Sequence, residues 1–120
     1  MIDYHIPLLP GDHYHIVSRA IGDEKIFREQ TDYDVFFSRF EKHVLPVAEI
    51  YCYCLLPNHI HFLVRIKDEP DITRYFKKIK KVNDYSYDKL SEFIMERFSN
   101  FLNSYTKSFN KKYYRGAVFL

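Results

Sequence analysis

The sequence has no tryptophan, only three glycines and two cysteines, and no apolar run that approaches the length of a membrane span. A bilayer-spanning helix needs about 20 apolar residues, so we expect no association with a membrane. The N-terminal stretch MIDYHIPLLPGDHYHIV places an acid and a histidine before any apolar run, which is unlike a secretory signal. Cys52 and Cys54 stand too close in an extended chain to form a useful disulfide. These absences predict a cytoplasmic, reducing location.

The composition is that of one compact domain. Hydrophobic residues make up 47% of the chain and aromatic residues 18%, which excludes a disordered protein. We expect residues 1–120 to form a single domain. The net charge of +2 is unevenly distributed, because basic residues gather in RYFKKIKK (74–81) and YTKSFNKKYYRG (105–116). A polyanion is a candidate partner for that half of the chain, and a solvated helix face is the plain alternative.

Hydrophobic periodicity predicts an α+β fold. The predicted order is a strand at 13–20, a helix at 31–45 capped by Thr31 or Asp32, strands at 48–56 and 59–67, a short helix from Asp71, a helix at 90–113 and the start of a strand at 117–120. Pro57 and Asn58 form the turn between the two middle strands. The long helix carries an apolar stripe of Ile94, Phe98, Leu102, Tyr105, Phe109 and Lys112. This order is the ferredoxin-like split β-α-β pattern, an antiparallel sheet with helices packed on one face.

Two histidines stand on one side of the third predicted strand. In the stretch LLPNHIHFLV, strand alternation puts His59, His61 and Leu63 on one face and Ile60 and Phe62 on the other. Imidazoles at this spacing are about 7 Å apart along the strand. Two neutral imidazoles held at that separation can bind one divalent ion and leave coordination positions open.

Three alternatives to a metal site built on His59 and His61 alone are weighed against it. Both rings could be ordinary core groups, each satisfied by backbone or water. A zinc site is conceivable, because Cys54 would face His61 across the hairpin and Leu56 would face His59. The second His-x-His motif, HYH at 13–15, begins its strand beside a loop and is interpreted as a surface or supporting feature.

Several segments resemble one protein family. YHIVSRA, DYDVFFSRF, YCYCLLPNHIHFLV and FSNFLNSYTKSFNKKYYRGAVF are similar, in the same order, to segments of the REP-associated tyrosine transposases, which belong to the HUH single-strand endonuclease superfamily. The resemblance covers nearly the whole chain except 67–92, and the PNHIHFLV motif followed by YTKxxNKKY is its most specific part.

The resemblance implies a metal-dependent reaction on single-stranded or hairpin DNA. His59 and His61 would bind Mg²⁺ or Mn²⁺, which polarises the scissile phosphate. Tyr105 would attack the phosphorus to form a 5′-phosphotyrosine and release a 3′-hydroxyl, and the reverse reaction would rejoin strands. The basic residues expected to hold the DNA backbone are Lys107, Lys111, Lys112 and Arg115. The family includes dimers in which one chain's tyrosine serves the other's histidines, so a homodimer is a further expectation.

The sequence departs from the family in two places. Relatives carry an amide or carboxylate ligand one turn beyond the tyrosine, where this chain has Phe109. Asn110 is the nearest amide and is the candidate third ligand, although in a regular helix it points about 140° away from Tyr105. The family also continues beyond 116–119, so the domain is interpreted as truncated at its C-terminus. The alternative functions are a single-stranded nucleic-acid-binding module without catalysis and a transposase remnant.

Overall fold

The computed structural model describes residues 7–20, 24–83 and 86–113. Within them the chain forms three strands and three helices: β1 (His13–Arg19), α1 (Gln30–His43), β2 (Ala48–Leu56), β3 (His59–Ile66), α2 (Glu69–Lys80) and α3 (Tyr87–Tyr113). The three strands make one antiparallel sheet in the order β1-β3-β2. The predicted α+β fold is therefore confirmed. The predicted strand at 117–120 lies outside the described residues.

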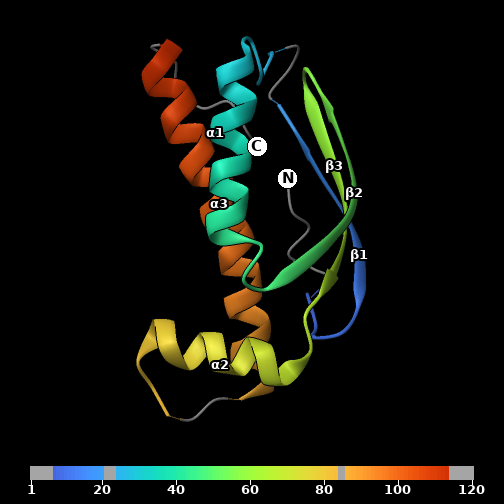
Figure 1. The fold of residues 1–120 in the computed structure, drawn as a ribbon, viewed down its shortest axis with the longest axis vertical. Coiled ribbons are helices and arrows are strands. Elements are labelled where there is room, and N and C mark those ends of the chain that lie inside the picture. The colour runs from blue at the N-terminus through green and yellow to red at the C-terminus, as the bar shows by residue number, and fades with distance from the viewer. Residues whose placement is uncertain (1–6, 21–23, 84–85, 114–120) are drawn as a thin grey trace.

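The helices cover one face of the sheet. In Figure 1, α1 and α3 lie side by side on the same side of the sheet, and α2 crosses one end of α3. The core lies between these layers and is built largely from the inward-facing residues of β3 and the aromatic residues of the helices. Its β3 members, each no more than 1% exposed, are Ile60, Phe62, Val64 and Ile66. No described element covers the other face of the sheet, which we call the open face.

A bulge in β2 sets which of its residues reach the open face. Ile50 pairs with Val64, but Cys52 pairs with Leu63, so one extra residue is inserted at Tyr51. Because strand side chains alternate, an extra residue exchanges the two faces beyond it. Ala48 can therefore face the helices while Cys52 lies on the open face.

The three described helices begin earlier than the sequence predicts, and for α1 and α2 the cap residues lie further upstream. The N-cap of α1 is Glu29, which forms a capping box with Asp32, so neither Thr31 nor Asp32 is the cap. Helix α2 begins at Glu69 rather than Asp71, since Pro70 is tolerated in a first turn. Helix α3 begins at Tyr87 rather than Leu90.

The buried stripe of α3 also differs from the prediction. The buried residues after Phe98 are Phe101, Tyr105 and Phe109, whereas Leu102 is only partly buried and Lys112 is exposed. A helix has 3.6 residues per turn, so a stripe followed in steps of four drifts away from the core. No helix among the described ranges is both long and apolar enough to cross a bilayer.

Candidate metal and nucleic-acid site

The open face carries the paired histidines. Along β3 buried residues alternate with accessible ones, so His59 and His61 lie half-buried on the open face while Ile60 and Phe62 face the core. The two rings are 4.9 Å apart between centroids and are inclined by 73°. The sequence prediction that they share a face, away from the apolar core, is confirmed.

The Asn58 side chain of the hairpin turn orients the first histidine. His59 Nδ1 lies 2.8 Å from Asn58 Oδ1. An amide oxygen accepts but cannot donate, so this hydrogen bond requires a proton on His59 Nδ1, and in the neutral ring Nε2 then carries the lone pair. A histidine bonded in this way through one nitrogen presents the other nitrogen to a metal ion.

His15 contacts the second histidine. Its Nε2 lies 2.9 Å from His61 Nδ1, and the two rings are stacked with centroids 5.1 Å apart. The pKa of His61 is lowered, first by desolvation and then by the charges of His59, His15 and Arg19. A lowered pKa keeps the ring neutral near pH 7, the form that binds a metal. The sequence predicted a surface or supporting role for His15 and gave no sign of this contact, because the two partners are 46 residues apart.

A shallow hollow of about 140 Å³ adjoins His61 on the open face. It is lined by His15, His61, Leu63 and both cysteines, among others. Cys54 is paired with His61 and Leu56 with His59, as the sequence predicted. Both cysteines are free thiols. Within the described part of the chain, no group of three or more His, Cys, Asp or Glu side chains is arranged to hold a metal ion. A closed zinc cage is therefore not preformed there.

Tyr105 lies on the other side of the sheet. Its side chain is 1% exposed, packs against Phe27 and Phe36, and donates a hydrogen bond to the carbonyl oxygen of Ile26. Burial, followed by the nearby charge of Asp32, raises its pKa well above the ordinary value of a phenol. The structure does not bring this hydroxyl together with the histidines, so its role as the nucleophile stays a prediction.

The other residues predicted on α3 make no recorded contact with the histidines among the described residues. Asn110 is partly buried, and its Oδ1 has no hydrogen-bond partner among the described residues. Lys107 and Lys111 are exposed to solvent. Arg115 lies outside the described residues.

Lys112 joins α3 to α1 through a buried carboxylate. Its Nζ is 2.8 Å from Asp32 Oδ1 and 3.0 Å from a carboxylate oxygen of Glu29. Asp32 also accepts hydrogen bonds from the Tyr113 hydroxyl and two backbone amides. Burial alone would raise the pKa of Asp32, but the hydrogen bonds from Lys112, Tyr113 and the amides outweigh it and lower that pKa. In this structure Lys112 therefore ties the two helices together.

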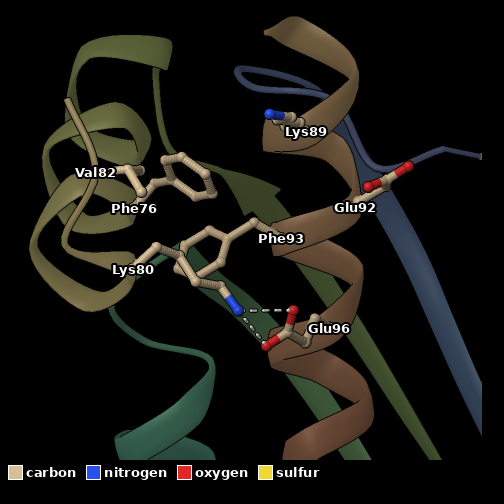
Figure 2. Close-up of a pocket in the computed structure, with 7 residues that line it drawn as sticks. All are labelled: Phe76, Lys80, Val82, Lys89, Glu92, Phe93 and Glu96. Carbon is tan, nitrogen blue, oxygen red and sulfur yellow. Dashed lines mark hydrogen bonds and ion pairs between the residues drawn. The ribbon is translucent and has the colours of Figure 1, made fainter. Parts of the chain in front are cut away.

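A second hollow lies at the N-terminal end of α3 and contains none of the predicted site residues. It has a volume of about 430 Å³ and lies between α2 and the first turns of α3. Figure 2 shows Phe76 and Phe93 within it and the ion pair of Lys80 with Glu96 at its edge. Charges of both signs surround it, so neither an anion nor a cation is favoured.

These observations define an α+β domain with helices on one face of its sheet and a two-histidine site on the other. A family model described as "Transposase IS200 like" matches residues 10–118. The chain therefore belongs to the IS200-like transposases, a family of proteins that act on DNA.

The comparison with solved structures supports the fold. The chain is similar to that in the structure of "the REP associates tyrosine transposase bound to a REP hairpin", with a TM-score of 0.59 and 14% sequence identity. The match covers 100% of this chain and 58% of the other, so the chain spans just over half the length of that transposase. No curated protein matches the chain. The resemblance derived from PNHIHFLV is thus confirmed.

Proposed function

We propose that this chain is a transposase-like endonuclease and strand transferase that acts on single-stranded, hairpin-forming DNA with Mg²⁺ or Mn²⁺ at His59 and His61. One observation carries the proposal: two adjacent rings on the open face each have Nδ1 in contact with a neighbouring side chain, so that Nε2 is the nitrogen of each ring that could bind a shared ion. The match to a transposase bound to a REP hairpin suggests the DNA partner.

The donor set fits a divalent ion that also binds the substrate. Two neutral imidazoles are too few to enclose an ion, so positions stay open for phosphate oxygens and water. Such an ion would polarise a phosphate oxygen of the scissile bond. The chain's own contribution is to hold the two rings rigidly on β3 and to keep His61 neutral.

The open face also supplies groups that suit single-stranded DNA. Arg19 is exposed and is paired with His59 across β1 and β3, and we infer that its guanidinium binds a phosphate beside the histidines. Further along the face, Tyr51 stacks on His13 with ring centroids 5.5 Å apart. Tyr51 is 52% exposed and offers a flat surface on which an unpaired base can stack.

The nucleophile proposed from the family resemblance is Tyr105. Its phenolic oxygen would form a bond to phosphorus as the bond to the 3′-oxygen breaks, so the phosphodiester is conserved as a 5′-phosphotyrosine. The buried hydroxyl can take this role only if the end of α3 separates from α1, in the same chain or in a homodimer. Otherwise a different tyrosine attacks.

The test is formation of a covalent adduct. The protein is incubated with Mn²⁺ and a fluorescent hairpin-bearing single strand, separated on a denaturing gel, and the modified peptide is mapped by mass spectrometry. We expect an adduct that His61→Ala abolishes and Asp34→Asn, a change on the exposed side of α1, does not. Loss of the adduct in Tyr105→Phe, with the modified peptide containing Tyr105, would support the nucleophile. An adduct on another tyrosine would refute that assignment but retain the function.

A binding-only module is the second candidate, and the burial of Tyr105 favours it. This module would bind the same strand with salt-sensitive affinity through its basic side chains. It would give no adduct with Mn²⁺, and neither His61→Ala nor Tyr105→Phe would change that result.

A further inference from the structure

The pairing of β1 with β3 places a third histidine beside the proposed metal ligands. His15 is opposite Leu63, and Val17 is opposite His61, so His15 and His61 are diagonal neighbours on the open face. Their ring planes are within 20° of parallel and their centroids are 5.1 Å apart, so the rings meet edge to edge with Nε2 of His15 2.9 Å from Nδ1 of His61.

A hydrogen bond across the 2.9 Å contact between His15 Nε2 and His61 Nδ1 uses one proton, which either nitrogen can carry, and the two placements have opposite consequences for His61 Nε2. If the proton is on His15, then His61 accepts through Nδ1 and its own proton must be on Nε2, where it blocks a metal. If His61 donates from Nδ1, its Nε2 has a free lone pair. Only the second placement suits a metal ligand.

We propose that His15 is a positioning residue that accepts a hydrogen bond from His61 Nδ1 and thereby presents His61 Nε2 to the metal. The inference rests on the proposed function. It gives the two ligands matching supports, with Asn58 on His59 and His15 on His61.

Among the described residues, no other neighbour of His61 makes a hydrogen bond to its Nδ1. Val17 is apolar, and His59 meets the ring edge to face at 73°. Cys54 lies opposite His61 on β2, but a thiol is a weak acceptor. Arg19 carries only donors. The orientation of the His61 ring therefore depends on His15.

The first experiment reads the tautomer of His61 in metal-free protein. Long-range ¹H–¹⁵N NMR spectra are recorded above the titration range of histidine, with the His61 signals identified by their loss in His61→Gln. We expect a protonated Nδ1 and a bare Nε2 in the wild type, and loss of this preference in His15→Ala. The control is His13→Ala, which removes a histidine from the same strand and face that contacts Tyr51 instead. A protonated Nε2 in the wild type, or an unchanged tautomer in His15→Ala, overturns the proposal.

The second experiment measures Mn²⁺ affinity by electron paramagnetic resonance. Loss of an outer partner of a metal-bound histidine weakens metal binding by about 10- to 100-fold, and we expect this for His15→Ala. His15→Gln, whose amide oxygen can accept from His61 Nδ1, should restore much of the affinity, and His13→Ala should leave it unchanged. Equal Mn²⁺ affinities in the wild type and His15→Ala overturn the role of His15 but leave the proposed metal site standing. Absence of Mn²⁺ binding in the wild type overturns it together with the proposed metal site.

Discussion

Replacing Tyr105 with phenylalanine separates a structural role from a chemical one. The substitution keeps the ring that packs against Phe27 and Phe36, so it leaves no cavity of consequence. It removes the hydrogen bond from the hydroxyl to the Ile26 carbonyl oxygen, which is then left buried without this donor. Ile26 is also tied by its amide to the Pro57 carbonyl of the hairpin turn, so we expect local strain rather than unfolding.

The expected cost follows from that single lost bond. A buried hydrogen bond contributes about 1 kcal/mol net, and an unsatisfied partner adds to the loss, so the free energy of unfolding should fall by about 1–2 kcal/mol. For a domain of this size each kcal/mol lowers the melting temperature by about 4 °C. Urea denaturation followed by circular dichroism measures the change. Tyr53→Phe is the matched control, because Tyr53 is 55% exposed and its ring contact with Phe37 is retained.

Two results would refute this reasoning. A Tyr105→Phe protein as stable as Tyr53→Phe would mean that the hydroxyl is not held by Ile26 in solution. A fully unfolded variant would mean that the hydroxyl contributes far more than one hydrogen bond. If the variant loses stability as expected yet forms the DNA adduct at wild-type yield, Tyr105 is a core residue and not the nucleophile.

Three further predictions concern the helix junction, the open face and the thiols. Asp32→Asn should lower the free energy of unfolding by about 2 kcal/mol, the range for hydrogen bonds to a charged group, while Asp34→Asn on the exposed side of α1 should change little. The pKa of Asp32 in the folded protein lies below its ordinary value of 3.8, so the ionised carboxylate stabilises the fold fully above pH 3.8. This stabilisation is lost as the pH falls through the lowered pKa. The free energy of unfolding of Asp32→Asn should therefore lack this loss at acid pH. Arg19→Ala should reduce the magnitude of the salt dependence of single-strand binding by about 0.7 in log–log slope, as loss of one phosphate contact requires, and an unchanged slope would place the DNA elsewhere. Cys54→Ser should leave Mn²⁺ binding intact. If zinc copurifies with the wild type but not with this variant, the result would instead support a zinc site at Cys54 and His61.

Local patterns in the sequence predicted the sheet and its faces well. Alternation along β3 placed His59 and His61 opposite the apolar residues, and the Pro57-Asn58 turn fixed the hairpin register, because both depend on neighbours in the chain. The helix starts were less predictable, since Glu29 and Asp68 cap helices from positions that carry no periodic signal.

The contact between His15 and His61 lay beyond local patterns. It depends on the register of β1 against β3, and residues separated by 46 positions give no short-range signal. A single sequence cannot decide between registers that differ by two residues, because both keep the apolar face inward.

The separation of Tyr105 from the histidines, in contrast, had a signal in the sequence. Tyr105 belongs to the same apolar stripe as Phe98 and Phe109, and that stripe must pack on the apolar face of the sheet. The histidines occupy the other face of the same strand. A residue on the stripe therefore points away from the histidines unless the helix moves. Only the family resemblance predicted that Tyr105 and the histidines act together.

Mn²⁺ binding in the presence of a hairpin-bearing single strand tests whether His59 and His61 form a metal site. We expect the wild type to bind one ion per chain, seen by electron paramagnetic resonance, and His59→Ala and His61→Ala each to abolish this binding while both variants stay folded. Mn²⁺ bound equally well by all three proteins, or by none of them, would contradict the claim that these two histidines form a metal site for DNA.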